Sequence, residues 1–336
     1  SSDFAANAIH QIFLLGEPLV LYRTQAGDIA ALEDRCCHRA APLSKGRREG
    51  DDLRCMYHGI KFGPGGQCTE LPGQSVIPAA VRVRSYPVAE RHGAIWVWMG
   101  DPAKADAALI PDFIGPDNAD WAVATSHLDI AAEAQLLIDN LLDVSHAPYV
   151  HEATFAAGNR DNVARMVRAE QEARVTRLDR GVNVERWIVG REDNPFLDGI
   201  TTDDFAFNQV NVPGIFTMYT YCFPTGTFQR TGEMRLPDET PLLARFVGQI
   251  ITPVADGRCK LYYAAGPWQA HAAFRDQFFS TVTTAFQEDE DIIVAQQTIN
   301  DALPDRAMMT LNMDGPLTRY ANIVRKLMQE EVTAVG

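Results

Sequence analysis

Two short stretches, Cys36-Cys37-His38 and Cys55-Met56-Tyr57-His58, decide the fold of the first part of the chain. Sixteen residues separate them, and each stretch pairs one cysteine with one histidine. Two thiolates and two imidazoles suit either a tetrahedral zinc ion or a [2Fe–2S] cluster with the cysteines on one iron and the histidines on the other. Zinc fingers pair Cys with Cys and His with His, whereas a cluster needs each loop to reach both irons. The pattern favours the cluster over zinc, with the ligands Cys36, His38, Cys55 and His58.

The residues beside these ligands support the same interpretation. Cys36-Cys37-His38-Arg39 and Cys55-Met56-Tyr57-His58-Gly59 closely resemble the Rieske signature. Because neutral imidazoles replace two anionic thiolates, such a cluster has a potential of roughly −150 to +300 mV, against about −400 mV for an all-cysteine ferredoxin. It therefore accepts electrons readily from a reductase. Cys37 stands where the family usually has proline, and we interpret it as a packed thiol rather than a fifth ligand.

Around these motifs the sequence has the rhythm of a small all-β domain. Short apolar runs at residues 18–22, 29–32 and 94–98 alternate with turns rich in Gly, Pro and Asp. The stretch 111–120 repeats Pro, Gly and Asp and is the most plausible boundary. We therefore predict a cluster-binding domain at residues 1–112.

Beyond the boundary, longer elements predict an α+β domain over residues 113–336. Helices are expected at 136–150, 272–299 and 317–331. Strands are expected at 214–223, 245–254 and 260–265. The first two of these strands are apolar on both faces, as in a sheet that is covered on each side.

Composition excludes several classes of partner. The net charge of −14 and the pI near 5.0 disfavour nucleic acid and anionic membrane surfaces, and Lys and Arg form no stripe. No apolar run is long enough to span a bilayer, and the start of the chain lacks the basic and apolar regions of a signal peptide. We expect a cytoplasmic protein.

A second group of candidate metal ligands lies in residues 139–151. His146 and His151 are five residues apart, which on a straight helix is about 140° around the axis, too far to share one metal. Pro148 lies between them, and a break there would turn His151 back toward His146. Asn140 and Asp143 lie upstream at helical spacing. A non-haem iron that binds O₂ needs two histidines and one carboxylate on one face.

The carboxylate is expected from the long helix at 272–299. Asp289 interrupts its apolar stripe, and Glu290 borders the same stripe. A buried lone carboxylate is costly unless it is paired or bound to a metal. Periodicity favours Asp289 over Glu290 only slightly, and a partly exposed helix edge is the alternative.

Together these segments resemble the Rieske oxygenase alpha subunits, particularly the short branch that includes vanillate O-demethylase and dicamba monooxygenase. The resemblance runs from 34–44 through 95–102 and 139–143 to 288–291. It implies an all-β Rieske [2Fe–2S] domain followed by a helix-grip-like catalytic domain with an antiparallel sheet and long helices. The branch usually begins with one more strand, which carries an aromatic pair and has no counterpart in this sequence.

The resemblance also implies roles for individual residues. Asp289 would be the carboxylate ligand beside His146 and His151. Asp143, with Asn140 near it, would belong to the catalytic centre and bridge a cluster histidine of one subunit to an iron histidine of the next. Because the two metal sites of one chain lie in different domains, a head-to-tail homotrimer is expected.

The implied reaction begins with electrons from NAD(P)H, delivered to the cluster by a ferredoxin or a flavin reductase and passed to Fe(II). With O₂ as co-substrate, the enzyme would hydroxylate or O-demethylate an aromatic, carboxylated substrate. Ring dihydroxylation and N-dealkylation are alternatives within the family. Two further alternatives are a Rieske electron-transfer protein and a zinc-stabilised binding protein. Candidate pocket walls are Phe205, Phe207, Phe216, Met218 and Tyr219.

Overall fold

The computed structural model describes residue 4 and residues 8–156, 159–192, 194 and 196–333. The chain is divided into two compact units. The first is Ser1–Asp112 together with Pro253–Ala255, and the second is Phe113–Thr252 together with Asp256–Gly336. Among the described residues, no helix combines the length and the apolar character needed to cross a membrane.

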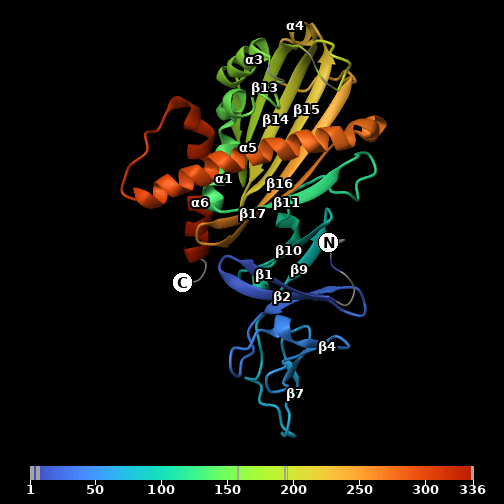
Figure 1. Cartoon of the computed structure of the whole chain (residues 1–336), viewed down its shortest axis with the longest axis vertical. Helices are drawn as coiled ribbons and strands as arrows, with labels where there is room; N and C mark the ends of the chain where they lie inside the picture. The colour runs from blue at the N-terminus through green and yellow to red at the C-terminus, as the bar shows by residue number, and fades with distance from the viewer. Residues whose placement is uncertain (1–3, 5–7, 157–158, 193, 195, 334–336) are drawn as a thin grey trace. The chain divides into compact units, whose positions relative to one another are not determined.

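The first unit is built from short antiparallel strands, drawn in blue to teal in Figure 1. One sheet has the order β1-β2-β3-β8, with the strands Ile9–Leu14, Glu17–Arg23, Ile29–Glu33 and Ser85–Tyr86. A second has the order β4-β5-β6-β7, with the strands Arg47–Glu49, Asp52–Arg54, Lys61–Phe62 and Cys68–Glu70. β9 (Val88–Arg91) and β10 (Ala94–Val97) form a hairpin. The three predicted apolar runs coincide with β2, β3 and β10, so the all-β prediction is confirmed.

The second unit is a seven-stranded antiparallel sheet with the order β11-β17-β16-β15-β14-β13-β12. In chain order these strands are Ala124–Ile130, Arg174–Arg177, Gly181–Arg191, Thr202–Asn211, Ile215–Pro224, Leu243–Ala255 and Arg258–Pro267. The α-helices α1 to α6 are Ala134–Leu142, Ala147–Val150, Arg160–Gln171, Thr227–Thr231, Arg275–Ala302 and Gly315–Thr333. The α+β prediction is confirmed, and the predicted strands and long helices match β15, β16, β17, α5 and α6.

The two faces of this sheet have different neighbours. Figure 1 shows α5 running across one face, and Val282 and Phe286 of this helix share a core with Phe216 and Val247 of the sheet. Aromatic residues gather on the other face, where Trp187, Phe205 and Phe223 form a separate buried cluster. Both faces are therefore apolar, as predicted, and the alternation along each strand decides which side chain faces the helices.

The segment predicted as one helix at 136–150 is divided into three pieces. α1 ends at Leu142, and Asp143 leaves the helical region with φ −99° and ψ 80°. A 3₁₀ turn, Val144–His146, leads into the short helix α2. The predicted break at Pro148 is wrong, because Pro148 lies in the first turn of α2, where its missing N–H has no partner to lose. The breaks lie instead at Asp143 and at His151, which ends α2.

Candidate metal centres and substrate cavity

The two cysteine loops of the first unit have the same backbone geometry. The N–H of Ala40 donates to the carbonyl of Cys36, and the N–H of Gly59 donates to the carbonyl of Cys55, each at 2.9 Å. Both donors have positive φ, 56° for Ala40 and 78° for Gly59, which closes each loop tightly. Two equivalent turns therefore present their cysteines to each other.

The side chains of these loops fit the predicted cluster. Cys36 and Cys55 are buried at 2% and 1% exposure and contact each other. His38 and His58 are exposed, with ring centroids 4.5 Å apart. Burial, with Cys55 adding to it, raises the pKa of the Cys36 thiol to about 11, so a thiolate here needs a bound cation. Paired buried thiols beside paired imidazoles match a cluster that has different ligands on its two irons.

The interpretation of Cys37 as a packed thiol is wrong, because this residue is exposed. It follows Cys36 at the start of the loop, where the chain faces solvent. Cys68 is half-buried in β7, outside the two loops.

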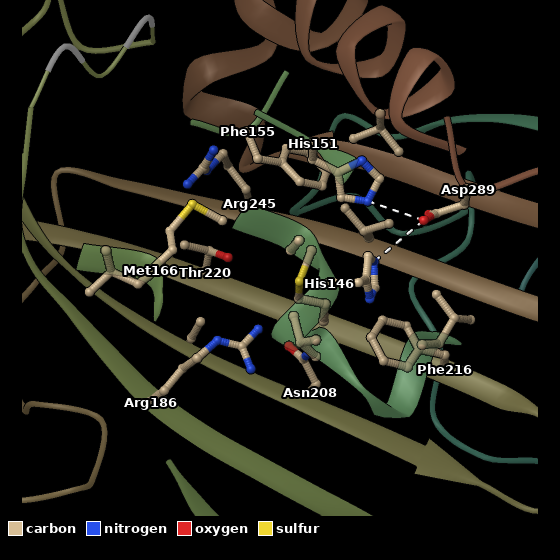
Figure 2. Close-up of a pocket in the computed structure, with 18 of the residues that line it drawn as sticks. His146, His151, Phe155, Met166, Arg186, Asn208, Phe216, Thr220, Arg245 and Asp289 are labelled. Carbon is tan, nitrogen blue, oxygen red and sulfur yellow. Dashed lines mark ion pairs between the residues drawn. The ribbon is translucent and has the colours of Figure 1, made fainter. Parts of the chain in front are cut away.

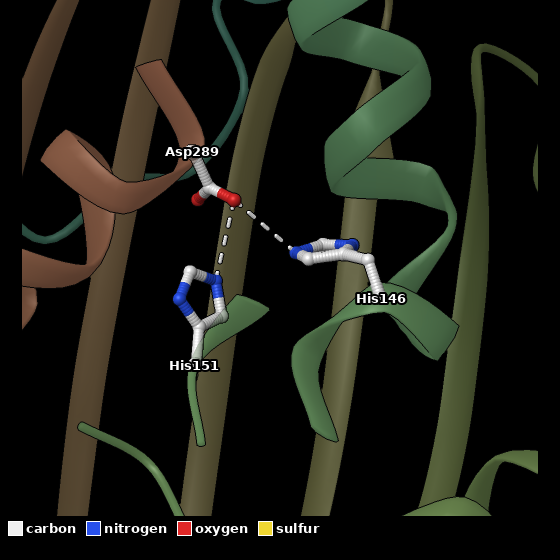
Figure 3. Close-up of side chains that lie close together, drawn as sticks. All are labelled: His146, His151 and Asp289. Carbon is white, nitrogen blue, oxygen red and sulfur yellow. Dashed lines mark ion pairs between the residues drawn. The ribbon is translucent and has the colours of Figure 1, made fainter. Parts of the chain in front are cut away.

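The second unit brings the predicted iron ligands together, as Figure 3 shows. The Nε2 atom of His146 lies 3.4 Å from Asp289 Oδ1, and Nε2 of His151 lies 3.3 Å from the same oxygen. One ligand atom from each of the three residues falls within 4.8 Å of the others. The two short helical segments after α1 position the histidines, and α5 supplies the carboxylate.

Burial and charge at this group fit a metal cation. Asp289 is only 3% exposed and His151 only 2%. Burial acts to raise the pKa of Asp289, but the two histidines outweigh it and lower that pKa to about 2. Burial acts to lower the pKa of His151, yet Asp289 and Glu288 raise it above its ordinary value. Two imidazoles and one carboxylate with open positions are the donor set of non-haem Fe(II).

Neighbouring groups hold each ligand in orientation. Glu288 Oε2 accepts hydrogen bonds from His151 Nδ1 and Thr154 Oγ1, both at 2.9 Å. Asn140 Nδ2 donates to Asp289 Oδ1 at 3.2 Å. Because the Nδ1–H of His151 donates to Glu288, the proton is on Nδ1, and the lone pair of Nε2 points toward the metal site. Sequence reasoning missed Glu288, although it directly precedes Asp289 on the same helix.

Asp143 meets His146 through its main chain. Its carbonyl oxygen contacts His146 Nδ1. Its carboxylate caps the 3₁₀ turn by accepting from the N–H of Ser145 at 3.1 Å and from the Ser145 hydroxyl. The bridge between subunits that was predicted for Asp143 involves a second chain and stays a prediction.

We expect Glu288→Ala to weaken iron binding by roughly 10- to 100-fold, because outer-shell partners of ligating histidines contribute about that much to metal affinity. The measurement is the iron retained after dialysis against graded chelator concentrations. Glu290→Ala on the same helix is the matched control, since Glu290 has no contact with the histidines in the described structure. Equal iron retention in the two variants would count against the orienting role of Glu288.

The three predicted ligands, His146, His151 and Asp289, line a cavity of about 120 Å³ (Figure 2). One water needs only about 10–15 Å³ on this measure, so the space is sufficient for a larger ligand. Phe216 and Met218 line the cavity, as predicted. Phe205, Phe207 and Tyr219 do not, because alternate residues of a strand point to opposite faces. For these three residues the prediction is wrong.

A Rieske-type β domain, followed by an antiparallel sheet with two histidines and a carboxylate beside a cavity, defines a class of proteins, the Rieske non-haem iron oxygenases. Two family models agree with it. Residues 1–87 match the Rieske [2Fe-2S] domain, and residues 130–330 match the vanillate O-demethylase oxygenase C-terminal domain. The chain belongs to the vanillate O-demethylase oxygenase family and is an oxidoreductase.

Individual relatives cover nearly the whole chain. The iron-sulfur subunit of the toluene-4-sulfonate monooxygenase system of Comamonas testosteroni is 32% identical, over 98% of this chain and 94% of its own length. The vanillate O-demethylase oxygenase subunit of a Pseudomonas species is 30% identical, over 96% and 97%. A crystal structure of dicamba monooxygenase with non-heme iron and dicamba superposes with a TM-score of 0.75 and 28% identity, over 98% and 94%. The cofactors are a Rieske [2Fe–2S] cluster and a mononuclear iron.

Proposed function

We propose that this chain is the terminal oxygenase component that hydroxylates or O-demethylates an aromatic, carboxylated substrate. The observation that carries the proposal is the buried His146, His151 and Asp289 group beside a largely apolar cavity. Relatives named for vanillate, dicamba and toluene-4-sulfonate support an aromatic substrate. A Rieske electron carrier would leave both this group and the cavity without a purpose.

We assign the cluster to Cys36, His38, Cys55 and His58, and the iron to His146, His151 and Asp289. When bound, the cluster supplies single electrons and the iron activates O₂. The chain itself orients the ligands through Glu288 and Asn140. The apolar walls of the cavity exclude water and hold the aromatic ring against the open side of the ligand group.

The proposed electron donor is a ferredoxin or a flavin reductase that uses NAD(P)H. The burial pattern of the cluster loops supports an external donor, because His38 and His58 face solvent while Cys36 and Cys55 are buried. An electron that enters or leaves at the imidazoles thus crosses little protein.

We propose a head-to-tail homotrimer, in which Asp143 would connect the cluster of one subunit to the iron of the next. An exposed apolar loop of the second unit supports an interface near Asp143. Met308 and Met309 are 74% and 84% exposed. Met313, half exposed, accepts a hydrogen bond from Ser145, the residue whose hydroxyl also contacts the Asp143 carboxylate.

The first test combines spectroscopy with turnover. Anaerobically purified protein should contain about three irons per chain and give a Rieske EPR signal on reduction with dithionite. With a reductase and NADH, methoxylated aromatic acids should release formaldehyde and the corresponding phenols. Colourless protein that contains zinc would refute the proposal, and a cis-dihydrodiol product would favour ring dioxygenation instead.

A further inference from the structure

The floor of the cavity carries buried polar side chains that the iron site does not use. Arg186 on β13 is 4% exposed and Asn208 on β14 is 2% exposed, and both line the cavity. Figure 2 shows them rising from the sheet, while Asp289 and the histidines come from the helices. Neither residue type is typical of an apolar core, so their place in the wall needs an explanation.

Asn208 is the more informative of the two. Neither its side-chain nitrogen nor its side-chain oxygen has a hydrogen-bond partner among the described residues. A buried amide without partners loses its bonds to water and gains nothing in return, so such groups are rare in native proteins. Because Asn208 faces the cavity, a bound ligand can supply the missing partner.

Arg186 lies beside Asn208 on the same face of the sheet. Arg186 pairs with Ala206 across β13 and β14, which makes Asn208 its diagonal neighbour two residues further along. Diagonal neighbours on a sheet are within reach of long side chains. A guanidinium has five N–H donors in a planar fork, so it can hold a protein partner and a ligand oxygen together.

The charges along the wall favour an anion. Three arginines line the cavity, and the only carboxylate that lines it among the described residues is Asp289, which belongs to the iron ligand group. Behind the wall, the buried Asp204 accepts from Arg191 at 3.0 Å and lies 3.6 Å from Arg245, so one carboxylate faces two guanidinium groups.

Resting on the proposed function, we propose that Arg186 and Asn208 form an anion subsite that binds the carboxylate or sulfonate group of the aromatic substrate. The guanidinium donates to the anionic oxygens, and the Asn208 amide donates its N–H to the same group. The anion is thereby fixed on the sheet floor, and the remainder of the ring is directed toward the helices that carry the iron ligands. This subsite decides which aromatic compounds enter.

Binding and turnover test this subsite separately. Equilibrium dialysis of the holoenzyme without reductant would compare 4-methoxybenzoate, 4-methoxybenzenesulfonate and the uncharged 4-methoxybenzamide. We expect at least one of the anions to bind about tenfold or more tightly than the amide, because hydrogen bonds to charged groups are the stronger ones. Which anion binds better distinguishes carboxylate from sulfonate as the natural group.

The variants Arg186→Met and Asn208→Leu should each remove most of the preference for the anion over the amide, and Arg186→Lys should restore part of it. Thr220→Val is the matched control, because Thr220 lines the same cavity from β15 at 9% exposure and is not part of the proposed subsite. Its anion preference should be unchanged. Equal affinity for anion and amide in the unaltered enzyme, or equal loss in the Thr220 variant, would overturn the subsite.

The result is independent of the proposed reaction. If the enzyme oxygenates neutral aromatics without preference for the anion, the subsite fails and the oxygenase function stands. If the anions bind through Arg186 and Asn208 but no product forms with O₂ and reductase, the subsite stands and the oxygenase function fails.

Discussion

Asp289→Ala is expected to reduce turnover to background while the Rieske EPR signal stays unchanged. Asp289 Oδ1 is the atom that both histidines approach, and the aspartate is the only carboxylate of the ligand group. Without it, two neutral imidazoles bind Fe(II) weakly, because the ligand group loses its only negatively charged donor. Metal analysis should fall from about three irons per chain to about two, with the cluster irons retained.

Glu290→Ala is the control for this experiment. Helical periodicity favours Asp289 over its neighbour Glu290 as the ligand only slightly. The Glu290→Ala variant should nevertheless keep full iron content and turnover. If Asp289→Ala retained the third iron, the assignment of the ligand would be wrong. Loss of the cluster signal in the same variant would indicate general unfolding, which the melting temperature would show.

Cys36→Ser should abolish the cluster and with it all reductase-driven turnover. Cys36 and Cys55 are the two buried cysteines of these loops. The third cysteine of the loops, Cys37, is exposed and therefore cannot take the place of Cys36. The variant protein should lose its red-brown absorption and contain about one iron per chain. Because metal binding contributes to folding, the first unit should also become less stable.

Cys37→Ser is the matched control, one residue away and without a ligand role. It should keep the absorption, the EPR signal and the activity. Binding of the aromatic anion by the second unit separates cluster loss from global misfolding in Cys36→Ser, because that unit has its own core. A cluster that survived Cys36→Ser and was lost in Cys37→Ser would reverse the ligand assignment.

The residues that the structure brings together at the candidate metal site could be predicted because their chemistry is visible in the sequence. Cysteine and histidine at short spacing restrict the metal, and a carboxylate in an apolar helix stripe is conspicuous. The position of the helix break could not be predicted in this way. Proline signals a break in a helix interior but is also favourable in a first turn, and only tertiary packing decides between the two at Pro148.

Two further features could not be predicted from the sequence, for a different reason. β14 and β15 are largely buried on both faces and carry apolar side chains on each, so alternation alone does not tell which set of side chains faces the helices. That ambiguity explains why Phe205 was assigned to the wrong face. Glu288 was missed because its partner His151 is 137 residues away in the chain, and such a contact leaves no local pattern.

The three proposed iron ligands come from helical segments, whereas Arg186, Asn208 and Gln249 come from strands. This division has a consequence for how such enzymes diversify. Substitutions on the strands can change which aromatic compound is bound without altering the atoms that hold the metal. Substrate preference can therefore change by mutation while iron binding is retained. A directed-evolution library confined to the cavity-facing positions of β13 to β16 should therefore yield many variants that keep their iron.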